Sequence, residues 1–118
     1  MFEDRLQAIA SRLGKARLVA LVAEDGMPVE THKESAEIDV EALAAEMITQ
    51  VRAIADQHDE MGMGRVRQLA ITTDQQTLML GTLAAGYYLL LALGAGASVG
   101  RARFELRRAP LAFDPDLE

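Results

Sequence analysis

Apolar residues recur at helical spacing over residues 2–13, where Leu6, Ile9 and Leu13 fall on one stripe. Charged residues occupy the opposite side, and Gly14 follows at the position expected for a helix C-cap. The pattern predicts an amphipathic helix.

A continuous apolar run follows over residues 18–23, and Asp25 and Gly26 then form a turn signal because glycine tolerates a positive φ. The next segment contains Pro28 and several polar or charged residues. We expect a β-hairpin here. Its first strand, apolar on both faces, should lie centrally in a sheet, and its second strand should lie at an edge.

Helical spacing returns over residues 39–60, with Asp39 as the expected N-cap. The apolar stripe comprises Val40, Leu43, Ala44, Met47, Ile48, Val51, Ile54 and Ala55. The opposite face carries small side chains where charged ones are usual, namely Ala42, Ala45, Thr49 and Ala53. Two interpretations fit this face: high helix propensity, since Ala is the best helix former, or a flat surface on which another helix packs closely.

Gly62 and Gly64 end that helix, and residues 65–73 then alternate imperfectly between apolar and polar. Val66, Gln68 and Ala70 are expected on one face, with Arg67, Leu69 and Ile71 nearer the other. Charged residues at its start favour a second edge strand. We assign Val66, Gln68 and Leu69 to the same candidate interaction surface as the small helical face.

The segment 75–100 contains no charged residue and exceeds the ~20 apolar residues that mark a membrane-spanning helix. Its glycines instead divide it into two strand-length pieces, 77–83 and 87–93, joined by a short connector. The upstream helix and strands also need partners in a sheet. We therefore predict two buried strands, the second of them central, and no membrane span.

The last periodic segment begins at Ser98, a suitable N-cap, and places Val99, Ala102, Leu106 and Ala109 on one face. Pro110 is expected to end this helix, leaving residues 111–118 as a short, loosely held acidic tail after a single domain of residues 1–110. The predicted fold is α+β in the order α-β-β-α-β-β-β-α, with a five-stranded antiparallel sheet.

Composition narrows the classes of function. The chain has 118 residues, half of them hydrophobic, no cysteine and a net charge of −6. The absence of cysteine removes disulfides and thiolate zinc sites, and the first residues lack the apolar core of a secretory signal, so we expect a cytoplasmic protein. The negative charge argues against nucleic acid as the main partner.

No pattern carries a sharp catalytic or ligand signature. Gly94, Gly96 and Gly100 resemble part of a dinucleotide fingerprint, but too few residues follow to complete a βαβ unit, which favours a tight strand-to-helix turn. His58 stands beside acids with only one other histidine in the chain, so a solvated helix end is favoured over a metal site. We predict no cofactor, no metal and no enzymatic activity.

Arginines at four positions give the last helix a basic patch: Arg101, Arg103, Arg107 and Arg108. Such a face is usually solvated, and the alternative is contact with an acidic partner.

The order of elements, the hairpin LVALVAEDGMPVE, the long second helix and the C-terminal stretch LAITTDQQTLMLGTLAAGYYLLLALGAGASVGRARFELRRA together resemble the Roadblock / dynein light chain family, including its bacterial MglB-like members. The resemblance covers residues 1–110. It implies one long helix on one face of the sheet, two terminal helices on the other, and dimers in which the second helix and third strand pair across a two-fold axis.

The same resemblance implies function. Bacterial relatives act on small Ras-like GTPases as activators or co-regulators, eukaryotic ones serve as dynein light chains, and neither binds nucleotide. We therefore expect a homodimer that binds a Ras-like GTPase and modulates its nucleotide cycle. The alternatives are a structural dimeric adaptor and, with less support from the residues, a small enzyme or ligand-binding module.

Overall fold

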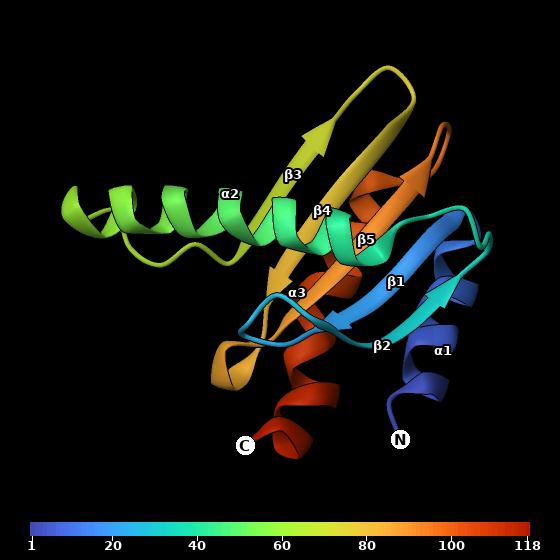
Figure 1. Cartoon of the computed structure of the whole chain (residues 1–118), viewed down its shortest axis with the longest axis horizontal. Coiled ribbons are helices and arrows are strands. Elements are labelled where there is room, and N and C mark those ends of the chain that lie inside the picture. Colours follow the sequence, from blue (N-terminus) through green and yellow to red (C-terminus); the bar gives the residue numbers. More distant parts are fainter.

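Five antiparallel strands form one open sheet, and helices cover both of its faces (Figure 1). The structure is a computed structural model that describes all residues, 1–118. In chain order its elements are α1 (Glu3–Leu13), β1 (Ala16–Val22), β2 (Pro28–Lys33), α2 (Val40–Glu60), β3 (Gln68–Thr72), β4 (Gln76–Thr82), the 3₁₀ turn η1 (Ala84–Gly86), β5 (Tyr88–Gly94) and α3 (Val99–Leu117). The predicted fold class and element order are confirmed.

The strands lie in the order β2-β1-β5-β4-β3, so β5 is the centre of the sheet and β2 and β3 are its edges. β1 pairs with β5 along its length, with Val19 opposite Leu91 and Leu21 opposite Leu89. Both strands are almost wholly buried. The continuous apolar runs therefore form the inner strands, as predicted, and the hairpin's polar second strand forms an edge.

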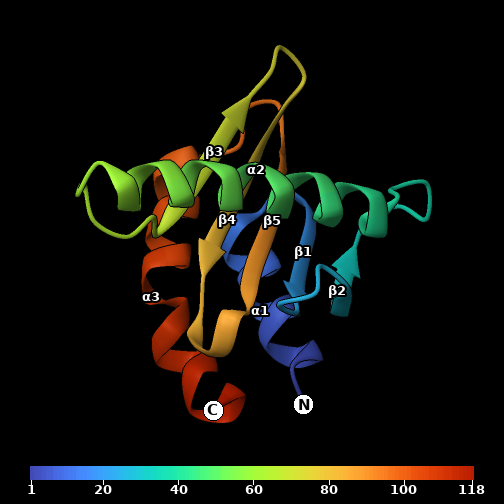
Figure 2. The ribbon, with the colours of Figure 1, turned by 60° about the vertical axis from the view of Figure 1, so that its left-hand side comes forward.

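The two faces of the sheet have separate hydrophobic cores. On one face α2 packs alone, with Met47 and Val51 against Leu90 of β5 and neighbouring side chains of β1 and β4. On the other face α1 and α3 lie side by side, so that Leu6 and Leu106 share one core (Figure 2). This is the predicted division of the helices.

Local sequence signals set the ends of the helices. Asp39 Oδ1 accepts a hydrogen bond from the Ala42 amide at 3.1 Å, and Ser98 Oγ accepts one from the Arg101 amide at 3.1 Å. Each bond satisfies an amide that would otherwise lack a partner in the first turn of α2 or α3. Gly14 ends α1 with a φ of +75°. All three predicted caps are confirmed.

The uncharged segment 75–100 becomes β4, η1, β5 and the turn into α3. No helix of the structure is long and apolar enough to cross a membrane. Gly96 occupies the turn with a φ of +82°, as a tight strand-to-helix turn requires. At Gly81 a β-carbon would lie 3.0 Å from Leu106 Cδ2, so this glycine allows α3 to approach β4 closely.

The prediction that α3 ends at Pro110 is wrong. The helix continues through Pro110 to Leu117, and Phe113 is buried, with its ring stacked 5.9 Å from that of Phe2. Asp114 Oδ1 also accepts a hydrogen bond from the Ala84 amide at 2.9 Å. Proline in a helix costs about 3 kcal/mol, and burial of a phenylalanine ring together with these contacts offsets that cost.

The third strand begins later than predicted, at Gln68 and not at residue 65. Val66 therefore does not share a face with Gln68. It packs with Leu69 against the core beneath α2, because the residues before the strand do not follow its two-residue alternation.

Phe113→Ala tests whether the end of α3 belongs to the core. We expect a loss of about 3–5 kcal/mol in the free energy of unfolding, because the substitution leaves a cavity between α1 and α3. Urea unfolding at a fixed protein concentration measures it. Leu111→Ala, at a side chain that is 84% exposed on the same helix, is the control and should change stability by less than about 0.5 kcal/mol. Equal, small effects of both substitutions would contradict the packing of Phe113.

Candidate interaction surface

The outer face of α2 is a stripe of small side chains. Ala42, Ala45, Thr49 and Ala53 are all exposed and follow one another at spacings of three or four residues. Since the buried stripe packs on the sheet, these four residues point directly away from it. At 1.5 Å per residue the stripe is about 16 Å long.

This stripe presents almost no polar group to a partner. The Thr49 hydroxyl donates a hydrogen bond to the Ala45 carbonyl at 2.8 Å, so its proton is already used within the helix. Glu46 and Gln50 border the stripe and are joined by a 3.1 Å hydrogen bond. The result is a flat surface of methyl groups on which a second helix can approach closely.

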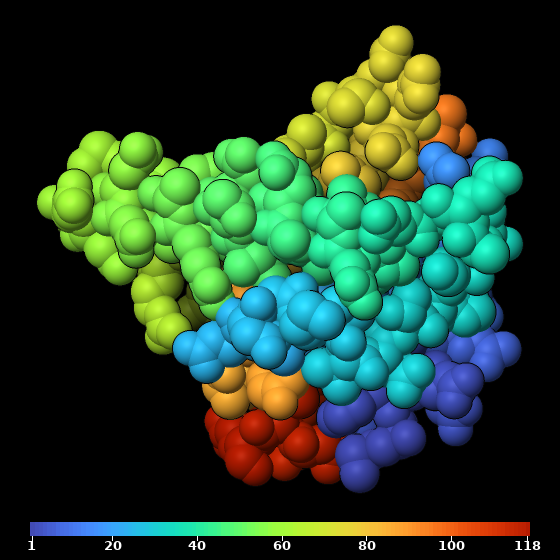
Figure 3. Space-filling view, viewed as in Figure 1, coloured from blue at the N-terminus to red at the C-terminus, as the bar shows by residue number.

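The C-terminal half of α2 extends beyond the sheet (Figures 1 and 2). Ile54 and Ala55 continue the buried stripe, yet both are only half-buried, whereas Val51 one turn earlier is 2% exposed. Figure 3 shows this half of α2 and the β3–β4 hairpin as two projections that diverge from the body. Apolar side chains in this region therefore lack full cover within one copy of the chain.

The edge strand β3 pairs with β4 alone, so its outer edge carries unpaired backbone groups. Leu69 and Val66 are half-buried between β3 and α2. Gln68 lies on the opposite face of the sheet, where its Nε2 donates to the Arg103 carbonyl at 3.3 Å. Figures 1 and 2 show α2 crossing the sheet face near β3, and Val66 and Leu69 pack against the core beneath α2, although the seven predicted residues do not form one continuous patch.

Three further residues of this flank escape sequence reasoning. Met61 and Met63, in the connector after α2, are 60% and 65% exposed, and Ile71 of β3 is 37% exposed. The sequence gives only a weak signal for the two methionines, namely that they are large apolar residues next to Gly62 and Gly64. Exposed apolar side chains beside a small-residue helix face extend the surface available to a partner.

Two other groups that could carry chemistry make contacts within the chain. No group of three or more metal-ligating residues comes together, and His58 Nδ1 lies 3.0 Å from the Ile54 carbonyl of its own helix. The pKa of Arg12 is raised, chiefly by its hydrogen bonds to the buried Glu105 carboxylate and secondarily by the attraction between their charges, while burial opposes the shift. This ion pair joins α1 to α3 across a part-buried contact.

Comparison with known proteins shows that the chain is similar to several solved structures in fold. No family profile matches the sequence, and a search of curated proteins finds no significant relative. Among solved structures, a Roadblock/LC7 domain from Streptomyces avermitilis matches with a TM-score of 0.84 and 19% identity, over 95% of this chain and 93% of that one. Myxococcus xanthus MglB matches with a TM-score of 0.83 and 16% identity, over 93% and 89% of the two chains.

A structure described as MglB with tetrameric arrangement matches with a TM-score of 0.85 and 16% identity, over 95% of this chain and 84% of that one. The chain therefore has the fold of Roadblock/LC7 domains and of MglB. At the level of fold, these matches confirm the resemblance drawn from the sequence.

Proposed function

We propose that this chain, a Roadblock fold, is a non-enzymatic cytoplasmic homodimer that binds a small Ras-like GTPase and modulates its GTP hydrolysis or nucleotide exchange. The observation that carries the dimer is the small-residue face of α2 beside the unpaired edge of β3. Two copies related by a two-fold axis would place α2 against α2 and β3 against β3. Such a contact is self-complementary, because the same patch serves both copies.

Energetics supports this arrangement. Methyl groups along α2 allow two helix backbones to approach closely, and each buried Å² of apolar surface contributes about 25 cal/mol. The half-buried Ile54 and the exposed Met61 and Met63 would gain cover from the second copy. Pairing of two β3 edges would satisfy backbone groups that one copy leaves to water.

The GTPase partner is proposed from the resemblance to bacterial Roadblock proteins and from the likeness in fold to MglB. A rigid dimer surface can bind one conformation of the switch loops of a GTPase more tightly than another. It thereby shifts the population toward a hydrolysis-competent or nucleotide-exchanging state. This mechanism requires no catalytic residue from the chain itself.

Ala45→Glu and Ala53→Glu test the dimer. Either substitution would bury an unpaired carboxylate between two α2 helices, so we expect the dissociation constant of the dimer to rise by about a hundredfold or more. Sedimentation equilibrium or light scattering over a range of concentrations measures it. The matched control is Ala8→Glu, which introduces the same charge at an exposed alanine of α1, on the other face of the sheet.

The proposed dimer surface is wrong if the wild-type chain is monomeric at micromolar concentrations. It is also wrong if Ala45→Glu and Ala8→Glu chains associate equally well.

The GTPase proposal is tested with purified small Ras-like GTPases, beginning with any that is encoded beside this chain. We expect the chain to bind one of them and to change its rate of GTP hydrolysis or of GDP release by about tenfold or more. Single-turnover hydrolysis and release of a fluorescent GDP analogue distinguish these two activities. Binding without a change in either rate would instead support a structural adaptor. Absence of binding would exclude the hypothesis of GTPase regulation for that pair of proteins.

A further inference from the structure

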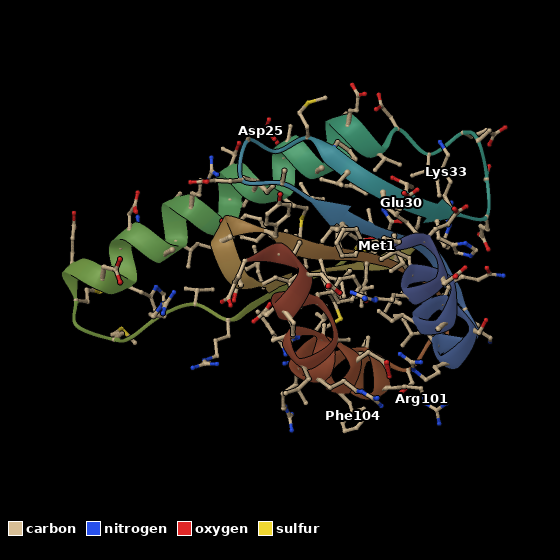
Figure 4. The ribbon with its side chains drawn as sticks, turned by 90° about the horizontal axis from the view of Figure 1, so that it is seen from below. Met1, Asp25, Glu30, Lys33, Arg101 and Phe104 are labelled. Carbon is tan, nitrogen blue, oxygen red and sulfur yellow. The ribbon has the colours of Figure 1, made fainter.

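The outer side of α3, on the face of the sheet opposite α2, carries a basic and aromatic surface. We define the α3 arginine face as Arg101, Phe104, Arg107, Arg108 and Leu111, all of which are exposed. Figure 4 shows Arg101 and Phe104 pointing away from the sheet. Because α3 and α2 cover opposite faces of the sheet, a contact through α2 does not cover these residues.

The arginines of this face have no acidic partners within the chain. The ion pairs of the structure are Arg5–Asp116, Arg12–Glu105 and Arg17–Glu34, and none involves Arg101, Arg107 or Arg108. The chain carries a net charge of −6, so a cluster of arginines without acidic partners is unusual on its surface.

A hollow of about 580 Å³ lies beside the arginine face, at the junction of α1 and α3. Its charged side chains are Arg12, Arg101, Arg108 and Glu105. Glu105 is already bound to Arg12 at 2.8 Å. Arg101 donates one hydrogen bond from Nη1 to the Arg12 carbonyl at 3.1 Å, so its remaining donors and those of Arg108 are available to a ligand.

Phe104 is the one apolar residue that lines the hollow, and it is 52% exposed. The guanidinium of Arg108 lies over its ring, 5.7 Å from the centroid. A stacked arginine keeps its donors free for a carboxylate while the ring presents an apolar edge. The hollow therefore offers charge-assisted hydrogen bonds and apolar contact at one place.

We infer that the α3 arginine face docks an acidic segment of a partner protein, in which carboxylates bind Arg101 and Arg108 and an apolar side chain packs on Phe104. The face runs over eleven residues of helix, from Arg101 to Leu111, and is about 15 Å long, a length that suits a short peptide segment. This inference does not depend on the proposed dimer or on the GTPase.

Charge outside the arginine face argues against an anionic membrane or nucleic acid as the occupant. Beyond Leu111 the same helix carries Asp114, Asp116 and Glu118, of which Asp114 accepts from the Ala84 amide and Asp116 pairs with Arg5. The chain as a whole has a net charge of −6, so an extended anionic surface would meet repulsion outside the arginine face. A short segment can contact the basic half alone. The favoured occupant is therefore a peptide segment whose acidic residues are clustered.

Random twelve-residue peptides displayed on phage provide the test. Peptides are selected on the full wild-type chain and counter-selected on the Arg108→Glu chain at physiological ionic strength. We expect enrichment of sequences that combine several Asp or Glu residues with an apolar residue. Circular dichroism and thermal melting check that each variant is folded.

Fluorescence anisotropy with the most enriched peptide then measures affinity. We expect Arg101→Glu and Arg108→Glu each to weaken binding by about tenfold or more, and Phe104→Ala by about threefold or more. Lys33→Glu is the matched control, since it makes the same charge change at an exposed residue of β2 and lies on another side of the molecule (Figure 4). It should leave the affinity within about twofold.

Three results overturn the inference. One is the selection of no peptide that distinguishes the wild-type chain from Arg108→Glu. Another is co-sedimentation with phosphatidylserine vesicles that Arg108→Glu abolishes, which would assign the face to a membrane. The last is a change of oligomeric state in the Arg108→Glu chain, which would show that a second copy covers the face.

Discussion

The central strands are apolar on both faces, and the rest of the fold depends on that constraint. In β5, Leu89, Leu91 and Leu93 face one side of the sheet, while Leu90 and Ala92 face the other, and all five are buried. A strand of this kind is stable only when both faces are covered. Helices must therefore cover both faces of the sheet, and the chain has three α-helices for these two faces.

The uneven division of helices accounts for the proposed dimer surface. α1 and α3 share one face, and the stacked rings of Phe2 and Phe113 close it at the chain ends. α2 covers the other face alone and extends past it, so the apolar stripe that is buried at Val51 becomes half-buried at Ile54. The same burial that stabilises the sheet thus leaves apolar surface beside an open strand edge.

Sequence reasoning succeeds where a local pattern and the tertiary structure agree. The runs of β1 and β5, the Asp39 and Ser98 caps and the outward stripe of α2 follow from spacing and side-chain chemistry. It fails at Pro110, because the energy that keeps the helix intact comes from contacts between residues distant in sequence. Met61 and Met63 lie in a connector that is neither helix nor strand, so no periodic pattern of apolar residues predicts that their side chains are exposed.

Two surfaces of different chemistry therefore lie on opposite faces of the sheet. The proposed contact through α2 would depend on burial of methyl groups and be only weakly sensitive to salt, whereas the proposed contact through Arg101 and Arg108 would be between charges and weaken as salt screens them. Under the two proposals one side of the chain holds a second copy and the other an acidic segment, and raising the ionic strength would weaken the second contact more than the first.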